Sequence, residues 1–315
     1  MTGYLMTSDH RAYTLPRLIS WNLTYTGSVP CDSFTVTFLY EKVMAEPLHL
    51  AAGFSAMENG QVMLRGIVDE YTVSMTDKGL LATVRGRGYA ARLLDNEARP
   101  VTYQAATLAE IVRCHVEPYG ISCREIADVR ANSTYTVAAG TSQWRALENF
   151  CHAYGGFSPR FNRDGQLLAT AELDSGKRLA IHDGTPVISC TLREDHYGVL
   201  TEVLVIDKKQ NVEYSVKNQD MINRGGQCRR VVYTPGQSTW AAMRYTGEYQ
   251  IDRSKEEEKR ISICLPGNFA VFPGDIVRLN LKRIGIAGEY RTEETENIFS
   301  ASEGAMEKLQ LKEKT

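Results

Sequence analysis

A change of pattern near residue 90 constrains the fold of this 315-residue chain more than any other feature. Before it, apolar and polar residues alternate, which is typical of half-buried strands, and after it apolar residues recur at helical spacing. Residues 83–98 connect the two patterns. Gly86 and Gly88 are expected to let the backbone leave a sheet, and Pro100 to end the short helical turn that follows. We therefore interpret residues 83–98 as a domain junction.

The Gly86-Arg87-Gly88 sequence does not predict a phosphate-binding loop. It lacks the third glycine of a dinucleotide-binding fingerprint and the Lys-Ser/Thr pair of a P-loop. The glycines are better explained by the junction itself.

The first segment is predicted to be a small barrel. Residues 17–26 alternate, and residues 33–40 place Phe34, Val36 and Phe38 on one face. A strand at 48–57 leads into Asn59-Gly60, a dipeptide suited to the positive φ of a tight turn. Further strands are expected at 62–75 and 80–84, with a turn at 76–79 between them. About five strands in roughly ninety residues suffice to close a sheet on itself and remove its free edges.

The second segment, near residues 99–181, is predicted to be a compact α/β unit. Thr107 can cap a helix whose apolar face holds Leu108, Ile111, Val112 and His115, before Pro118 and Gly120 end it. A second helix is expected from Thr141 to Gly155-Gly156, with Trp144, Leu147, Phe150 and Cys151 on one face. Residues 157–161 and 166–172 are predicted to form a hairpin around a turn at 162–165.

The third segment returns to β pattern, with one long helix. Strands are expected at 187–193, 200–207, 212–216 and 228–233, with a polar turn at 208–211 and a loop with a helical turn at 218–226. Ser238 can cap a helix near 238–256 that carries Trp240, Met243, Arg244 and Tyr249. The charged run 252–260 is interpreted as a solvated helix end or loop, although its opposed charges could instead face a partner subunit.

One plan of strands and turns occurs twice. Residues 273–312 contain a strand at 276–281, a turn at Gly285, a strand at 288–295, a loop at 302–304 and a strand at 308–311. Residues 47–86 follow the same order with few identities. The chain is therefore predicted to carry two related barrels that flank an inserted module.

Several stretches resemble one family. The helix end Leu-Leu-Asp-Asn-Glu-Ala at 93–98, the series Thr-Val-x-x-Gly-Thr-Ser-x-Trp at 136–144 and the sequence Val-Phe-Pro-Gly-Asp at 271–275 are similar to baseplate hub proteins of contractile phage tails and tailocins. That family includes the Mu-like tail hub and late control protein D proteins. The resemblance covers nearly the whole chain after Arg17, as a pattern and not as high identity.

The resemblance implies an α+β, mainly β fold with two related small antiparallel β-barrels flanking an inserted α/β helix-hairpin module. The expected domains are a first barrel at 1–98, the module at 99–181 and a second barrel at 182–315 that contains the helix near 238–256. Three copies in a closed ring would place six similar barrels around one axis. Such a homotrimer would join a hexameric tail tube to a trimeric spike and contact other baseplate proteins. Because no long carboxy-terminal domain follows, the spike is expected to be a separate polypeptide.

Composition restricts the alternatives. The 36 basic and 38 acidic residues give a net charge of −2 and a pI near 6.3, which does not predict specific nucleic-acid binding. The chain shows neither a signal peptide nor an apolar stretch long enough for a membrane anchor. Seven scattered cysteines without a Cys-x-x-Cys pair predict reduced, mostly buried thiols. The protein is therefore expected to be made in the host cytoplasm and assembled into the virion tail baseplate or a tailocin particle.

Two Cys-His pairs, Cys114-His115 and Cys151-His152, combine a nucleophile or metal ligand with a base. Neighbours on a helix point about 100° apart, so neither pair can bind a metal ion alone, and a zinc site would need both helices to face each other. The alternative is that the cysteines lie in the core and the histidines at helix margins. We expect no metal and no cofactor.

Acidic residues at strand ends raise the question of a glycosidase. Asp69, Glu70, Glu194 and Asp195 could act as paired carboxylates only at a fixed spacing across a cleft, whereas acids at strand ends are common. No nucleophile elbow and no His-Glu-x-x-His motif is present. We expect a protein that is not an enzyme, without catalytic or cofactor-binding residues.

The three tryptophans and four arginines have two interpretations each. Trp21, Trp144 and Trp240 lie on amphipathic elements and are expected in the core, although Trp240 could anchor a subunit interface. The arginines near strand ends are surface charges or line the face of a ring toward its neighbours; they are Arg85, Arg87, Arg229 and Arg230.

Two other functions stay open. The module at 107–172 could bind or degrade peptidoglycan, as tail-tip proteins do when they breach a cell wall. The chain could also be a different tail-tip component of a non-contractile phage.

Overall fold

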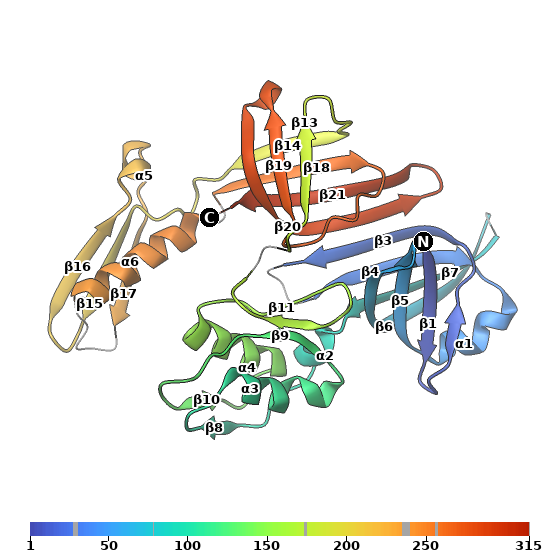
Figure 1. The fold of residues 1–315 in the computed structure, drawn as a ribbon, viewed down its shortest axis with the longest axis horizontal. Coiled ribbons are helices and arrows are strands. Elements are labelled where there is room, and N and C mark those ends of the chain that lie inside the picture. The colour runs from blue at the N-terminus through green and yellow to red at the C-terminus, as the bar shows by residue number, and fades with distance from the viewer. Residues whose placement is uncertain (28–30, 78, 173–174, 235–239, 256–257, 315) are drawn as a thin grey trace. The chain divides into compact units, whose positions relative to one another are not determined.

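The computed structural model describes residues 1–27, 31–77, 79–172, 175–234, 240–255 and 258–314 (Figure 1). The chain divides into two compact units. One comprises residues 1–189 and 263–310, and the other comprises residues 190–262 and 311–315. Strands dominate both, with several helices between them, which confirms the mainly β part of the predicted fold class.

A first set of strands occupies the amino-terminal part of the chain. It contains β1 (Thr2–Thr7), β2 (Ala12–Thr14), β3 (Leu18–Thr26), β4 (Ser33–Leu39), β5 (Ala51–Glu58), β6 (Gln61–Thr76) and β7 (Gly79–Gly88), with a 3₁₀ turn at Lys42–Met44 and α1 (Ala45–His49) before β5. Their spatial order is β2-β1-β5-β6-β7-β4-β3, and neighbouring strands are antiparallel. We call these seven strands the first strand set.

The predicted inward face of this set is confirmed. Phe34, Val36 and Phe38 are buried, and Phe34 stacks on Phe54 with ring centroids 4.2 Å apart. A bulge in β3 between Leu18 and Ser20 changes the phase of that strand, which explains why Leu18 is buried although it lies on the other face in the simple alternation.

Two details of the first set correct the sequence prediction. Leu48 lies in α1, so the strand expected at 48–57 begins at Ala51, because Pro47 sits in a helical turn. The set also has two amino-terminal strands that the prediction missed, β1 and β2. The Asn59-Gly60 turn is confirmed, with φ of 50° and 77°.

Gly86 lies inside β7 and does not let the backbone leave the sheet as predicted, whereas Gly88 is the last residue of that strand. The role of Gly86 is close approach: a Cβ there would lie 1.9 Å from the carbonyl oxygen of Ile67 and 2.7 Å from the Phe34 ring. A Cβ on Gly66, which is paired with Gly88, would lie 2.2 Å from the carbonyl oxygen of Arg87. The glycines therefore allow β6 and β7 to pack more tightly than side chains would permit.

The middle of the chain forms the inserted α/β module. Its elements are α2 (Ala91–Leu94), β8 (Val101–Tyr103), α3 (Leu108–His115), a 3₁₀ turn at Glu117–Tyr119, β9 (Cys123–Ile126), β10 (Tyr135–Val137), α4 (Gln143–Phe150), a π turn at Cys151–Gly155, β11 (Arg160–Phe161) and β12 (Leu167–Ala169). β8 pairs with β10, and β12 pairs with both β11 and β9. The hairpin is shorter than the predicted 157–172.

Capping explains where the two helices of the module begin. The Thr107 hydroxyl accepts the Glu110 N–H at 3.2 Å, and all four predicted inward residues of α3 are buried. The cap of α4 is Ser142, one residue after the predicted Thr141, and it accepts the Arg145 N–H at 3.1 Å. Trp144, with Leu147, Phe150 and Cys151, joins the core as predicted.

A second strand set lies in the carboxy-terminal part. It contains β13 (Arg178–His182), β14 (Ser189–Glu194), β18 (Lys259–Pro266), β19 (Ile276–Leu281), β20 (Ile286–Ser300) and β21 (Gly304–Glu313), with a 3₁₀ turn at Lys282–Ile284. Its spatial order is β13-β19-β20-β21-β18-β14. Gly285 makes the predicted turn with φ of 69°. β13 and β18 are absent from the sequence prediction, which gave 252–260 entirely to a helix end or loop.

The two sets share one topology. When β1, β3, β4, β5, β6 and β7 are matched to β13, β14, β18, β19, β20 and β21, chain order and spatial order agree throughout. The predicted repeat of strand and turn order at 47–86 and 273–312 is therefore confirmed. The sets differ at the outer strand, because β1 runs antiparallel to β5 whereas β13 runs parallel to β19.

An insertion between β14 and β18 forms a small subdomain. β15 (Glu202–Asp207) lies between β16 (Val212–Lys217) and β17 (Arg229–Thr234), and α5 (Gln219–Asn223) connects the last two. The helix α6 (Trp240–Lys255) lies along one face of this sheet (Figure 1), where Met243 and Ile251 pack on Val203 and Val205. The predicted capping residue of this helix, Ser238, lies outside the described residues.

The sequence predicts closed barrels, and this prediction is wrong: the strands that the structure describes form no closed barrel. The strand pairings form an open path with ends at β2 and β14, and its middle joins the two sets through antiparallel pairing of β20 with β3. The second half of β20 thus pairs with a strand of the other set instead of closing its own. Residues about 270 positions apart make this junction, so local patterns could not reveal it.

Candidate functional site and interaction surfaces

His115 is a buried structural group. Its Nδ1 lies 2.6 Å from Gln143 Oε1, and its Nε2 lies 3.0 Å from the Tyr103 hydroxyl. The Gln143 amide nitrogen donates to the Glu97 carbonyl at 3.2 Å, which fixes Oε1 as the atom facing the imidazole. Since an amide oxygen only accepts, Nδ1 carries the proton and Nε2 accepts from Tyr103. Every polar atom of the ring is satisfied, so His115 ties α3 to α4 and β8.

The other three residues of the two Cys-His pairs differ in their exposure to solvent. Cys114 and His152 are exposed, whereas Cys151 is buried and burial raises its pKa to about 12. A thiol with such a pKa is a poor nucleophile and a poor metal ligand at neutral pH. Within the described residues, no three His, Cys, Asp or Glu side chains gather closely enough to hold a metal ion.

All seven cysteines are free, but the expectation that most are buried is wrong. Only Cys151 is buried, Cys114 is exposed, and the other five are half-buried. Burial nevertheless raises the pKa of Cys31 and of Cys123 to about 11. These thiols therefore stay protonated at neutral pH.

Two of the four acidic candidates, Asp69 and Asp195, are partners of nearby arginines. Asp69 accepts two bonds from Arg87, at 2.7 and 2.9 Å, and Asp95 accepts two more from the same guanidinium. Asp195 accepts the Tyr197 N–H and a bond from Arg193, and these two interactions lower its pKa. A carboxyl with a lowered pKa cannot act as a general acid near neutral pH. Glu70 and Glu194 are exposed.

Three of the four arginines singled out above have intrachain partners. Arg87 holds the two aspartates, Arg229 pairs with Glu202 at 2.7 Å, and Arg230 donates to Gln250 at 2.9 Å. Arg85 is exposed and lies opposite Glu70 in the β6–β7 pairing. The contacts of Arg87, Arg229 and Arg230 explain these three side chains as part of the local surface structure.

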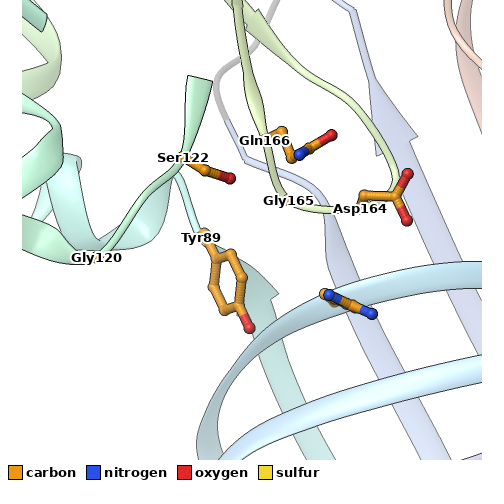
Figure 2. A pocket seen from close by; sticks show the side chains of 7 residues that line it. Tyr89, Gly120, Ser122, Asp164, Gly165 and Gln166 are labelled. Atoms are coloured by element: carbon orange, nitrogen blue, oxygen red, sulfur yellow. The ribbon is translucent and has the colours of Figure 1, made fainter. Parts of the chain in front are cut away.

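A hollow of about 400 Å³ lies beside the junction of the first strand set with the module. Figure 2 shows Tyr89 facing the turn formed by Asp164, Gly165 and Gln166. Gly165 has φ of 73°, and a Cβ there would lie 2.4 Å from the Tyr89 ring, so glycine lets the turn approach that ring. Arg65 and Ser122 also line the hollow.

The lining of this hollow offers hydrogen bonds and one pair of opposite charges, without an activated nucleophile or a base next to one. Asn162 Oδ1 accepts the backbone N–H groups of Asp164 and Gln166 at 3.0 and 2.9 Å, which fixes the turn. The arrangement positions the module on the first strand set and has no evident chemistry of its own.

Apolar side chains gather on the outer half of the β6–β7 hairpin. Tyr71, Val73 and Met75 of β6 are 40, 45 and 85% exposed, and Leu80 of β7 is 46% exposed. They share a face with the buried residues Val84 and Ala82, to which Tyr71 and Val73 are paired. The core-facing side of the sheet therefore continues past the core. We call Tyr71, Val73, Met75 and Leu80 the distal hairpin surface.

Three aromatic side chains of α6 are also exposed. Trp240, Tyr245 and Tyr249 are each about 60% exposed. The expectation of a core role is confirmed for Trp144, which is 3% exposed, and wrong for Trp240, which is 60% exposed and packs on Tyr214 with ring centroids 5.5 Å apart. Trp21 is half-buried and stacks on Phe299. An interface role, the alternative for Trp240, fits its exposure.

Sequence reasoning missed the distal hairpin surface. Alternation of Tyr71, Val73 and Met75 indicates a strand with one apolar face, but it cannot tell whether that face is covered. Among helices of the described chain, none combines the length and apolarity needed to cross a bilayer.

Comparison with known proteins shows the fold. No protein-family model matches the sequence, and no curated protein matches it. Solved structures do match. A tail protein from Neisseria meningitidis has a TM-score of 0.78 at 15% identity, over 99% of this chain and 96% of that one. A 43 kDa tail protein of prophage MuSo2 from Shewanella oneidensis has a TM-score of 0.79 at 15% identity, over 99% and 97%.

A third similar structure belongs to a secretion system. The E. coli c3393 protein, described as a component of the type VI secretion system with structural similarity to the T4 bacteriophage tail proteins gp27 and gp5, has a TM-score of 0.58 at 9% identity. The match covers 95% of this chain and 74% of that one. At these identities the comparisons show that the chain has the fold of phage tail proteins and of related injection-system components.

Proposed function

We propose that this protein is a structural subunit of a phage tail or related injection apparatus, and specifically a trimeric baseplate hub that joins a hexameric tail tube to a trimeric spike. The observation that carries the proposal is the repeated strand order, β1-β5-β6-β7-β4-β3 and β13-β19-β20-β21-β18-β14, within one chain. The fold likeness to tail proteins from two bacterial species and to a type VI component supports it.

The repeat matters because tube and spike have different symmetries. A chain with two similar strand sets, present three times around an axis, offers six similar positions to the tube and three identical positions to the spike. Each strand set would act as one barrel-like unit of the ring. The three-part division into 1–98, 99–181 and 182–315 remains our prediction for how the units are used, with the module outside the ring of strands.

The role proposed is mechanical and not enzymatic. Two of the candidate acids, Asp69 and Asp195, are held by arginines, and both ring nitrogens of His115 have hydrogen-bond partners. A near-neutral chain suits a lumen through which DNA or a tape-measure protein passes without being held. Partners would be the tube protein, the spike protein and other baseplate proteins, in a virion tail or tailocin assembled in the host cytoplasm.

Mass measurement tests the proposal. Native mass spectrometry and light scattering of the purified protein should give a species three times the 35.2 kDa chain mass. A strict monomer at high concentration, which also fails to bind tube or spike protein, would contradict the hub role. A zymogram on cell walls separates the alternative, because lysis would favour a peptidoglycan-degrading tail-tip protein.

A further inference from the structure

The long strand β20 has two halves with different neighbours on one edge. Residues 286–291 pair with β19, and residues 294–300 pair with β3 of the first strand set, while β21 occupies the opposite edge. The second half of β20 therefore connects one strand set to the other. It does so on the same edge that its own set uses for β19.

The matching strand β6 has the same two halves, but only one has a neighbour on the corresponding edge. Residues 61–67 pair with β5, and β7 runs along the opposite edge. For residues 70–75, no strand of the described chain lies on the β5 side. β6 thus carries, at the position where β20 meets β3, an edge without a partner.

In the second set, β14 corresponds to β3. The edge of β14 that corresponds to the β20-facing edge of β3 has no neighbour among the described strands. β3 lies between β4 and β20, whereas β14 pairs with β18 and ends the path of described strands. Among the open edges of the described strands, two therefore lie at the positions that β20 and β3 occupy in their pairing. One belongs to the outer half of β6, and the other belongs to β14.

Side chains at the β20–β3 pairing show which contacts join two strand sets. Trp21 of β3 stacks on Phe299 of β20 with centroids 4.2 Å apart, and its indole N–H donates to Asn297 Oδ1 at 2.8 Å. These groups lie on the face that continues to Leu23 and Tyr25, which are buried. The β20–β3 pairing is thus an extension of the core across two sets.

The two open edges have matching faces. On β6, Tyr71, Val73 and Met75 form an exposed apolar face, while Glu70, Thr72 and Ser74 form the polar face. On and just before β14, Ile188, Cys190 and Leu192 share one face, with Ile188 54% and Leu192 36% exposed, and Arg193 lies on the other face. Natural proteins protect open edges with charges or bulges, so an exposed edge with an apolar face indicates a partner strand.

We infer that residues 70–75 of β6 pair, antiparallel, with β14 (Ser189–Glu194) of a second copy of this chain. The contact reproduces between copies the β20–β3 junction that exists within each copy. Because each chain offers one edge of each kind, the contact is head-to-tail and closes into a ring when the rotation allows it. This inference rests on the proposed trimer and names the strands that hold it together.

A matched pair of variants tests the inference in the full-length protein. Val73→Glu places a charge on the apolar face of the β6 edge, and Val231→Glu places the same charge at an equally exposed valine (44% against 45%) on the edge strand β17. We expect Val73→Glu to weaken self-association roughly 100-fold and Val231→Glu to leave it within about threefold. Circular dichroism should show that both variants fold.

Rescue and hydrogen exchange identify the strands directly. A Leu192→Lys variant should also weaken assembly, and Val73→Glu with Leu192→Lys should recover part of it, because opposite charges would then face each other across the strands. In the assembled wild type, backbone amides of 70–75 and 189–194 should exchange at least about tenfold more slowly than in the Val73→Glu protein.

The outcomes separate the two proposals. A wild-type trimer that persists in Val73→Glu, with fast exchange at 70–75 and 189–194, would overturn the strand pairing and leave the trimeric hub standing. A wild-type protein that never self-associates would overturn both. Loss of assembly in Val231→Glu to the same extent as in Val73→Glu would also count against the pairing, since the effect would not be specific to the β6 edge.

Discussion

The two strand sets have the same order but different interior chemistry. In the first, glycines at 66 and 86 bring β6 and β7 close together beneath the stacked rings of Phe34 and Phe54. In the second, buried carboxylates organise the chain: Glu307, 1% exposed, accepts the N–H groups of Phe269 and Val271.

A second buried acid, Asp275, completes the polar interior of the second set. It accepts the Phe272 N–H at 2.9 Å and a bond from the Ser175 hydroxyl. Strand order therefore depends on turns and on the alternation of buried positions, whereas the groups that fill the interior are free to differ. This is why two copies of one plan retain so few identities.

The glycine contact of the first set should be the most sensitive position. Gly86→Val places a side chain 1.9 Å from the Ile67 carbonyl oxygen, which the backbone can relieve only by separating β6 from β7. We expect a loss of roughly 4 kcal/mol or more in the free energy of unfolding, measured by urea denaturation. Gly60→Ala is the control: it has open space around it and φ of 77°, and should cost about 1 kcal/mol. Equal losses would show that close approach is not what Gly86 provides.

Removal of the buried carboxylate of the second set should cause the next largest loss of stability. Glu307→Ala leaves the N–H groups of Phe269 and Val271 without their acceptor, and we expect a loss of about 3 kcal/mol. The exposed Glu303→Ala serves as the control and should change stability by less than about 0.5 kcal/mol. A Glu307→Ala protein as stable as the control would mean that the polar interior does not hold the 268–275 loop.

An acid just before β4, the half-buried Asp32, predicts a dependence on pH. Burial raises the pKa of Asp32 from 3.8 to about 7, against the opposing effect of the Thr26 N–H that it accepts at 2.9 Å. Between these values the folded state holds a proton that the unfolded state has released. The contribution of Asp32 to stability is therefore greatest below pH 4, falls as pH rises toward 7 and is constant above it.

Asp32→Asn removes this titration and keeps an acceptor for Thr26. Relative to the wild type, the variant should gain on the order of 2 kcal/mol between pH 4 and pH 6, measured as the difference between two urea-denaturation series. A difference that stays constant over this range would contradict the raised pKa.

The smallest effect is expected outside both strand sets. Trp240→Ala should change the free energy of unfolding by less than about 1 kcal/mol, because the side chain is 60% exposed, whereas Trp144→Ala, at 3% exposure, should lose about 4 kcal/mol. Thermal unfolding of both variants checks this. A large loss in Trp240→Ala would place the indole in the core, as the sequence alone suggests.

Local features of this chain could be predicted from the sequence because their causes are local. The Asn59-Gly60 turn, the Thr107 cap and the inward face of β4 each depend on a few neighbouring residues, and each is confirmed. The strand β1 could not be predicted because its buried positions are Gly3, Leu5 and Thr7, which do not form an apolar pattern in the sequence.

Long-range pairing could not be predicted in the same way. The β20–β3 junction and the parallel pairing of β13 with β19 join segments about 100 to 270 residues apart, and alternation within a strand does not name its neighbour. For the same reason the sequence predicts an ordinary strand at the distal hairpin surface, since Tyr71, Val73 and Met75 alternate as buried residues do. Only the three-dimensional structure shows that nothing in the described chain covers them.

A three-dimensional reconstruction of the isolated assembly by electron cryomicroscopy tests the central claim most directly. We predict a threefold ring in which the two strand sets of each chain alternate around the axis, giving six similar densities, with β6 of one copy beside β14 of the next. A ring lined by only one strand set of each chain, or an assembly in which the two sets occupy unrelated positions, would contradict it.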